Sequence, residues 1–398
     1  MLIERPTYLN KLKDFRDKDL IKVVTGIRRC GKSTLFDLFI DYLLKDGVQK
    51  EQIQHINFED ANYSKIKNNE DLFNLVNKNL IKDKMNYIFL DEIQNVKDFQ
   101  KACDNLYVIK NVDLYITGSN AYLLSGELST LLSGRYVEIK MLPLSFKEYI
   151  SYLGETDLQI KYNNYITNGS FPYVLNLKNE QDIKMYLDGI FNTIVVKDIA
   201  TRNNIADISM LKDVIRFMFD NIGSLVSSTK IANTMTSAGR KITVPTVESY
   251  LNALVNSYVL YKATRYDIKG KQYLTSGSKY YLSDLGLRYY LLGAKDADLG
   301  HLLENVIYLE LLRREYDVYV GKNDDQEADF VAMNSKTTEY YQVAYSAIEK
   351  ETLERELKPL NDINDHNQKF LITMDFTPYA NYNGIKKINA LDWLLGKI

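Results

Sequence analysis

A glycine-rich stretch near the start of the chain has the residue types that bind phosphate. Residues 26–33 fit the pattern G-x-x-x-x-G-K-[ST]. Glycine at positions 26 and 31 lets backbone N–H groups approach phosphate oxygens closely. The Lys32 ammonium would contact the β and γ phosphates, and the Ser33 hydroxyl is a hard oxygen ligand for Mg²⁺. The pattern predicts these nucleotide-binding residues: Gly26, Ile27, Arg28, Arg29, Cys30, Gly31, Lys32, Ser33 and Thr34.

The residues around this loop predict the elements that hold it. Ile21, Val23 and Val24 indicate a short buried strand before the loop, and apolar residues from Leu35 to Leu43 recur at helical spacing after it. The N-terminal dipole of that helix would face the bound anion. An ordinary glycine turn between a strand and a helix is the alternative.

A second motif argues against that alternative. Residues 87–90 are apolar and are followed by Asp91 and Glu92. This is the form of a buried parallel strand whose carboxyl end opens beside the phosphate loop. Asp91 would hold Mg²⁺ through water, and Glu92 would orient and deprotonate the attacking water. Taken alone, the motif also fits a strand that ends in a solvated acidic turn.

Two later strand ends offer further catalytic candidates. The strand predicted at 112–117 leads into Ser119 and Asn120, which would sense the γ-phosphate or hold the water. Both residue types are equally good helix caps. Arg135, before a strand at 136–140, could reach a γ-phosphate as an arginine finger, in cis or across a subunit contact. A surface or interdomain salt bridge explains Arg135 at least as well.

Composition sets outer bounds on the chain. Its 398 residues exceed one average core, so we expect two to four domains. The 50 Lys+Arg against 52 Asp+Glu give no overall bias toward nucleic acid. Two cysteines exclude a disulfide framework and fit a reducing compartment. The sequence has no apolar run of membrane-spanning length and no signal-peptide core at its start, so we expect a cytoplasmic protein with no membrane partner.

The alternation of strands and helices over residues 21–140 predicts an α/β fold, a parallel sheet with helices on both faces and a ligand at its carboxyl edge. Together with 57–60, 90–94, 116–120 and 132–135, the phosphate loop resembles predicted prokaryotic AAA-type P-loop ATPases with an uncharacterised C-terminal region. The likeness covers nearly the whole chain. It implies ATP hydrolysis with ATP and Mg²⁺ as cofactors, a P-loop domain over 1–150 and a helical lid over 151–205. In the lid, Arg202 could contact nucleotide or pair on the helix surface with Asp198.

Residues 206–299 predict a winged-helix domain. Three amphipathic helices are followed by two strand-like runs, and the third helix would present Thr246, Ser249 and Asn252 to a major groove. The wing between residues 262 and 279 is locally basic, which favours phosphate contact with DNA. A rigid spacer or a protein contact is an equal alternative. The five basic residues of the wing are Lys262, Arg265, Lys269, Lys271 and Lys279.

Residues 300–398 resemble the restriction-endonuclease-like α/β fold. That resemblance places Glu304, Asp329 and Gln342 around a Mg²⁺ ion at a scissile phosphate. The nuclease pattern also requires a lysine two residues after Gln342, where this chain has Ala344. Lys336 or Lys350 could substitute, but a degenerate domain used for scaffolding or nucleic-acid binding is the simpler interpretation.

Three functions therefore compete. The first is an ATPase that couples nucleotide state to movement of its C-terminal modules on DNA. The second is a nucleotide-dependent switch that acts through a protein partner or a homo-oligomer. The third is an ATP-regulated, metal-dependent nuclease.

Overall fold

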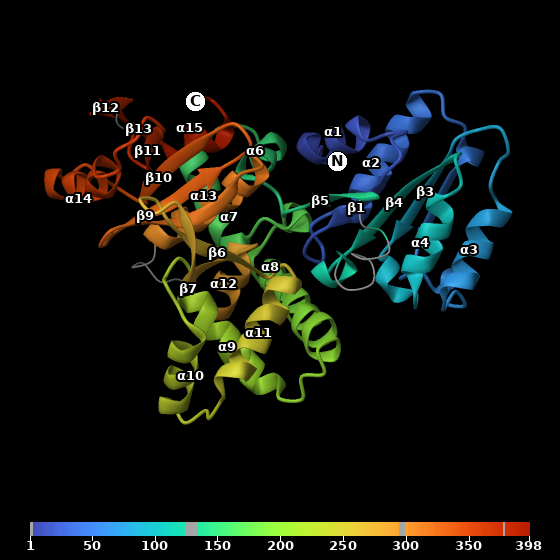
Figure 1. The fold of residues 1–398 in the computed structure, drawn as a ribbon, viewed down its shortest axis with the longest axis horizontal. Helices are drawn as coiled ribbons and strands as arrows, with labels where there is room; N and C mark the ends of the chain where they lie inside the picture. The colour runs from blue at the N-terminus through green and yellow to red at the C-terminus, as the bar shows by residue number, and fades with distance from the viewer. Residues whose placement is uncertain (1–2, 125–131, 133, 294–298, 377–378) are drawn as a thin grey trace. The chain divides into compact units, whose positions relative to one another are not determined.

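The computed structural model describes residues 3–124, 132, 134–293, 299–376 and 379–398 (Figure 1). The chain divides into two compact units. The first contains residues 1–143 together with Asn256–Tyr258, and the second contains Leu144–Val255 and Val259–Ile398.

The first unit is built on a five-stranded parallel sheet in the order β2-β3-β4-β1-β5. Because all strands run the same way and β4 lies between β1 and β3, the loops that follow these three strands meet at one carboxyl edge. The strands are β1 (Ile21–Thr25), β2 (Ile53–Asn57), β3 (Asn86–Asp91), β4 (Val112–Gly118) and β5 (Tyr136–Lys140).

Side chains alternate between the two faces of this sheet. On one face the rings of Phe89 and Tyr115 pack against Phe36 and Phe39 of α2 (Lys32–Lys45). On the other, Ile88, Leu90, Leu114 and Ile116 pack with apolar residues of α3 and α4. Figure 1 shows α3 and α4 covering this second face. The expected parallel sheet with helices on both faces is therefore confirmed. The other helices are α1 (Pro6–Asp14), α3 (Asn69–Lys78), α4 (Phe99–Tyr107), and the short η1 (Lys50–Gln52), η2 (Ala61–Tyr63), η3 (Ile93–Asn95) and η4 (Ala121–Leu124).

The second unit begins with helices. Their order continues into three helices and an antiparallel hairpin, β6 (Leu260–Asp267) and β7 (Gln272–Leu282), which is the order expected for a winged helix. The helices are α6 (Phe146–Leu153), α7 (Leu158–Asn168), η5 (Pro172–Asn176), α8 (Glu180–Asn192), η6 (Thr193–Thr201, a π-helix), α9 (Ile208–Asp220), α10 (Ser228–Ser237), α11 (Val244–Asn256) and α12 (Leu285–Leu292).

The hairpin also belongs to a larger sheet. Strand β6 pairs in parallel with β8 through residues 265–267, so the eight-stranded order is β12-β13-β11-β10-β9-β8-β6-β7. Phe330 packs with Tyr308 of α13 on one face of this sheet, whereas Val331 and Tyr340 pack with Leu357 of α14 on the other. The remaining elements are α13 (Leu299–Arg313), β8 (Asp317–Asn323), β9 (Gln326–Met333), β10 (Thr338–Ala344), α14 (Lys350–Asn361), β11 (Gln368–Thr373), β12 (Ala380–Tyr382), β13 (Ile385–Asn389) and α15 (Ala390–Leu395).

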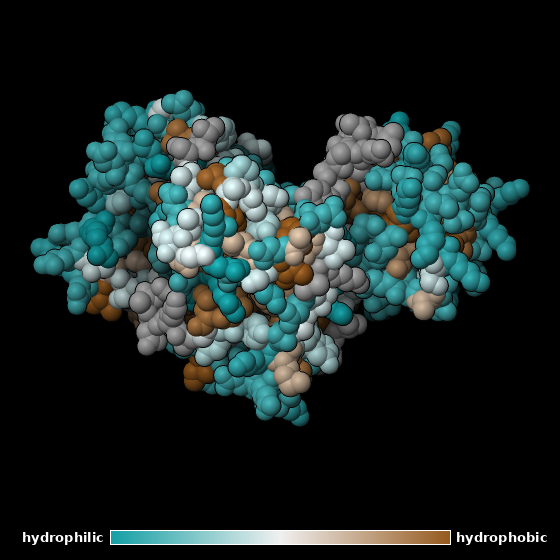
Figure 2. All heavy atoms as spheres, turned by 90° about the horizontal axis from the view of Figure 1, so that it is seen from below, coloured by the Kyte–Doolittle hydropathy of each residue, from teal (hydrophilic) through white to brown (hydrophobic). Residues whose placement is uncertain are grey.

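In the part of the chain that the structure describes, no helix is both long and apolar enough to cross a membrane. In the view of Figure 2 the surface is mostly hydrophilic, with hydrophobic side chains in scattered spots.

Candidate functional site

The phosphate loop follows β1 and turns sharply where the two glycines lie. Gly31, the residue before α2, has a φ of 104° in the left-handed region, and Arg29 has a φ of 68°. At Gly26 a Cβ would lie 2.1 Å from the carbonyl oxygen of Met141, so any side chain there would collide with backbone. Ile27 and Cys30 are fully buried, so their side chains anchor the loop. Burial also raises the pKa of the Cys30 thiol.

Lys32 connects the loop to the second motif. Its Nζ donates to the carbonyl oxygens of Gly26 at 3.1 Å and Ile27 at 3.3 Å. The same atom lies 3.5 Å from Oε1 of Glu92. The structure therefore brings the two motifs together, although 60 positions separate these residues in the sequence.

The tip of β4 fixes the two acids. The Thr117 hydroxyl donates to Asp91 Oδ1 and accepts the backbone N–H of Glu92 at 2.9 Å. Asn57, at the end of β2, donates its amide to Asp91 Oδ2 at 3.2 Å. Asp91 is fully buried. Neighbouring strands thus hold its carboxylate in one orientation.

Glu92 is held by a residue that the sequence reasoning missed. Gln94, in η3, donates its side-chain amide to Glu92 Oε2 and lies 3.5 Å from the Ser119 hydroxyl. Burial alone would raise the pKa of Glu92. The charge of Lys32, the hydrogen bond from Gln94, the charge of Arg28 and the Ser119 hydroxyl outweigh burial and lower it. Glu92 is therefore a carboxylate at neutral pH. The only sequence signal for Gln94 is its place two residues after Glu92.

The remaining residues predicted to bind nucleotide occupy different environments. Arg28 pairs with Glu59, which follows β2, whereas the side chain of Arg29 is exposed. Ser33 and Thr34 are half-buried in the first turn of α2. Ser119 and Asn120 are both buried at the tip of β4, and the Leu123 N–H donates to the Asn120 carbonyl oxygen at 3.1 Å in the turn that follows.

Arg135 lies at the wrong edge of the sheet for a contact in cis. Its carbonyl oxygen accepts the N–H of Ile21, the first residue of β1, at 2.8 Å. The phosphate loop follows the other end of that strand. The guanidinium pairs with Asp104 and lies over the ring of Tyr107, 5.3 Å from its centroid. The prediction of an arginine finger in cis is therefore wrong, because β5 starts where β1 starts; action across a subunit contact stays a prediction.

The residues at the carboxyl edge suit a nucleotide-bound magnesium ion. Hard oxygen donors are required, and Ser33 and Asp91 supply a hydroxyl and a carboxylate. Ser33 directly follows Lys32, and Asp91 directly precedes Glu92, so the 3.5 Å contact between Lys32 and Glu92 brings together the two chain segments that carry these donors. Asp91 already has hydrogen-bond partners on both oxygens that fix its orientation, as is usual for metal-binding carboxylates.

Comparisons with known proteins agree with this geometry. Residues 18–150 match the model of an AAA domain. An uncharacterized protein of Haemophilus influenzae is 42% identical over 99% of this chain and 99% of its own length. The chain belongs to a family of AAA-type P-loop ATPases. Residues 159–298 match a domain of unknown function.

Two more distant proteins extend the comparison. An uncharacterized protein of Methanocaldococcus jannaschii is 31% identical over 85% of this chain and 77% of its own length. The solved structure of a Walker-type ATPase from Pyrococcus abyssi has a TM-score of 0.52 at 14% identity, covering 73% of this chain and 96% of that one. At that identity the likeness establishes the fold, which is the P-loop fold expected from the sequence.

In the C-terminal region of this ATPase-family chain, the three residues predicted from the nuclease resemblance lie together. Glu304 is on α13, Asp329 on β9 and Gln342 on β10. The Gln342 side-chain oxygen accepts the N–H of Asp329 at 3.4 Å, and its amide donates to Glu356 at 3.1 Å. In the ranges that the structure describes, however, no three His, Cys, Asp or Glu side chains are arranged to hold one metal ion.

A lysine from another element lies at the centre of this cluster. Lys279 of β7 places its Nζ 3.0 Å from Glu304, 3.0 Å from Glu327 and 3.5 Å from Asp329. Its assignment to the basic surface of the wing was therefore wrong, because its ammonium is buried among carboxylates. Burial and the negative charges of Glu304 and Glu356 raise the pKa of Asp329 to about 7, and they outweigh the Lys279 ammonium and the Val343 N–H, which lower it.

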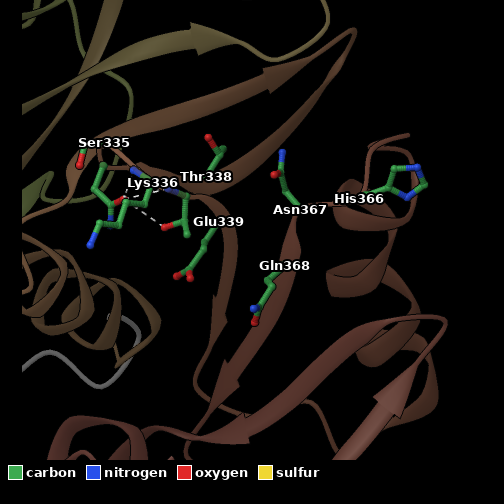
Figure 3. A pocket seen from close by; sticks show the side chains of 9 residues that line it. Ser335, Lys336, Thr338, Glu339, His366, Asn367 and Gln368 are labelled. Carbon is green, nitrogen blue, oxygen red and sulfur yellow. Dashed lines mark hydrogen bonds between the residues drawn. The ribbon is translucent and has the colours of Figure 1, made fainter.

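The two lysines considered as substitutes lie elsewhere. Lys336 lies in the turn between β9 and β10, beside a polar depression of about 380 Å³ (Figure 3). Four residues of β9, on the order of 13 Å, follow Asp329 before that turn. Lys350 begins α14 and is exposed beside Glu354. The prediction that either could complete the cluster was wrong.

Two ion pairs bear on smaller expectations. In the lid, Arg202 pairs with Asp198 one helical turn away at 3.7 Å, which is the helix-surface interpretation. In the wing, the exposed Lys269 lies 3.2 Å from Asp324, so part of the expected positive charge is neutralised.

Proposed function

We propose that this chain is a Mg²⁺-dependent ATPase in which the phosphate loop holds the triphosphate and Glu92 activates the attacking water. The observation that carries the proposal is the 3.5 Å contact between Lys32 and Glu92. A buried lysine that lies between a glycine loop and a carboxylate suits a site where phosphate oxygens would replace its present partners.

Each side chain then has a separate task. Lys32 would transfer its hydrogen bonds from the Gly26 and Ile27 carbonyl oxygens to the β and γ phosphates. Glu92, whose pKa is lowered, would accept the proton of the water. Gln94 would hold Glu92 in position and connect it with Ser119, which would sense the γ-phosphate together with Asn120.

Magnesium would be held by Ser33 and, through water, by Asp91. The ion would neutralise charge on the β and γ phosphates during transfer. Thr117 and Asn57 would keep Asp91 aimed at the ion, since they occupy its two oxygens from neighbouring strands.

The decisive experiment separates binding from turnover. Wild type should hydrolyse ATP, and Glu92→Gln should bind a fluorescent ATP analogue normally while turnover falls at least about 100-fold, as for loss of a general base. Glu70→Gln, at an exposed glutamate in the first turn of α3, is the matched control and should behave as wild type. Equal hydrolysis by wild type and Glu92→Gln would remove Glu92 from the mechanism.

We further propose that nucleotide state repositions the modules beyond residue 150 on DNA. The helix, helix, helix, hairpin order of residues 208–282 supports this, as do the exposed Ser249 and Asn252 on α11. Lys269 and Lys271 remain exposed on the wing. These features suit contact with phosphates and base edges in a duplex.

A specific observation favours a second candidate, a nucleotide switch with a protein partner. Helix α11 contains no lysine or arginine and exposes Glu248, and Lys279 is not part of the basic surface. Gel-shift titration across salt distinguishes the two. DNA binding that weakens steeply with salt, and less steeply in Lys269→Ala/Lys271→Ala, supports the DNA function, because each lost phosphate contact reduces the slope by about 0.9. Absence of salt-dependent binding to any duplex would support the switch.

A further inference from the structure

We propose that the ammonium group of Lys279 permanently takes the place of a metal ion in the C-terminal domain, so that this domain holds no divalent cation and cleaves no phosphodiester. The inference is independent of the ATPase proposal, since every residue involved lies in the second unit. It concerns the cluster formed by Lys279, Glu304, Glu327, Asp329 and Gln342.

The positive charge of Lys279 lies between the carboxylates that a metal ion would need. Three carboxylate oxygens, from Glu304, Glu327 and Asp329, surround Nζ of Lys279 at 3.0, 3.0 and 3.5 Å. These are distances to an ammonium, not to a metal, since hard cations bind oxygen at about 2.0–2.6 Å. These oxygens already face one positive charge, so a divalent ion drawn to them would be repelled by the ammonium.

Two protein donors already occupy one oxygen of Glu304, whereas each oxygen of Asp91 in the ATPase unit has a single donor among the described residues. Glu304 Oε1 accepts the hydroxyl of Tyr281 at 2.6 Å as well as the lysine. Asp329 Oδ2 accepts the N–H of Val343 at 2.9 Å. The oxygen of the Gln342 side chain faces the N–H of Asp329. A metal would therefore have to break several buried hydrogen bonds.

The space beside the second oxygen of Glu304 is limited. The other oxygen of Glu304, Oε2, faces the ring of His301 at 3.4 Å. Gly223, in the loop after α9, packs on the same side, where a Cβ would lie 2.8 Å from His301 Nδ1 and 3.2 Å from Glu304 Oε2. The side chains of Lys279 and Glu304 are each 6% exposed. Magnesium usually keeps several waters, and Gly223 and the His301 imidazole, whose side chain is 47% exposed, take up space on this side of Glu304.

The consequence for chemistry follows directly. Metal-dependent nucleases need the ion to generate hydroxide and to neutralise the developing phosphate charge. A lysine buried among three carboxylates can do neither for a phosphate outside the protein. The C-terminal domain is then a scaffold whose former metal position is filled by a side chain from β7.

The proposal makes an unusual prediction about removal of the lysine. Lys279→Ala leaves three carboxylates around an empty volume, which is the donor set that hard divalent cations prefer. Nucleotide-free full-length Lys279→Ala should gain one Mn²⁺ site per chain, measured by electron paramagnetic resonance of unbound Mn²⁺. That site should disappear in Lys279→Ala/Asp329→Asn. Lys336→Ala, at an exposed lysine of the same domain, should gain none.

Measurements on the wild type test the proposal even if Lys279→Ala does not fold. Wild type and Asp329→Asn should bind the same amount of Mn²⁺ without nucleotide, and wild type should not nick supercoiled DNA with Mg²⁺ or Mn²⁺. A site in wild type that Asp329→Asn removes would overturn the proposal, as would metal-dependent nicking that Asp329→Asn abolishes. Lys279→Gln keeps the side-chain length without the charge, and its failure to gain a Mn²⁺ site while folded would also overturn it.

Discussion

The two units of this protein each bury a lysine against carboxylates, and the two lysines are held very differently. Lys32 has one carboxylate partner at 3.5 Å and two backbone carbonyl oxygens. Lys279 has three carboxylate partners, two of them at 3.0 Å. Carbonyl oxygens are weaker partners for a cation than carboxylates, so phosphate can displace those of Lys32. An external anion would have to displace three carboxylates from Lys279.

Lys32 is placed to bind a ligand, whereas Lys279 stabilises the fold. Glycines and backbone amides surround Lys32, which leaves donors available for an anion. Tyr281 and the backbone N–H of Val343 complete the hydrogen bonding around Lys279. Removal of Lys32 should therefore affect binding, and removal of Lys279 should affect stability.

The largest expected effect is on the stability of the second unit. Lys279→Met leaves the buried Glu304 and the partly buried Glu327 and Asp329 without their counter-charge, which should lower the free energy of unfolding by about 3–5 kcal/mol. Trp393, the single tryptophan, is buried in α15, so its fluorescence during urea unfolding reports on this unit. Lys350→Met, at an exposed lysine, should change stability by less than about 0.5 kcal/mol. Equal effects of the two substitutions would contradict a structural role for Lys279.

The next effect is on nucleotide binding. Lys32→Ala should weaken binding of ATP at least about 100-fold, or about 2.7 kcal/mol, because the triphosphate loses its buried cation. Isothermal titration calorimetry measures the loss, and Lys45→Ala, at the exposed end of the same helix, is the control. If Lys32→Ala and Lys45→Ala bound ATP with the same affinity, the loop would not be the nucleotide site.

A smaller effect is expected at Gln94. Gln94→Ala frees Glu92 to change orientation, so kcat should fall about 10-fold with little change in KM, as for other outer partners of a site. The pH dependence of kcat should also move upward, since Gln94 helps to lower the pKa of Glu92. Asn95→Ala is the neighbouring exposed control. A merely structural role for Gln94 would leave the pH profile unchanged.

The smallest effect is expected at Arg135. In dilute protein, Arg135→Ala should leave turnover per chain unchanged, because Arg135 pairs with Asp104 at the opposite edge of the sheet. Measuring turnover against protein concentration decides whether Arg135 acts across a subunit contact. A defect that appears only at high concentration would support that role, and a defect at every concentration would contradict the cis geometry described above.

Much of the first unit could be predicted because its signals are local. The phosphate loop and the strand ending at Asp91 are contiguous patterns, and parallel strands bring their carboxyl ends to one edge. The predictions for Arg135 in cis and for Lys279 were wrong because the positions of these residues depend on contacts between segments far apart in the sequence. Arg135 stands directly before a strand whose register only the fold reveals. Lys279 was predicted to belong to the basic surface of the wing. Only the folded position of β7 places it beside Glu304 of α13 and Asp329 of β9.

The measurement that tests the central claim most directly is ATP turnover as a function of Mg²⁺ concentration for wild type, Ser33→Ala and Asp91→Asn. In the proposed mechanism, the Ser33 hydroxyl and the Asp91 carboxylate bind the same nucleotide-bound Mg²⁺ ion. Both variants should therefore need at least about 10-fold more Mg²⁺ than wild type for half-maximal turnover. The same Mg²⁺ requirement in all three proteins, or no turnover by wild type at any Mg²⁺ concentration, would contradict it.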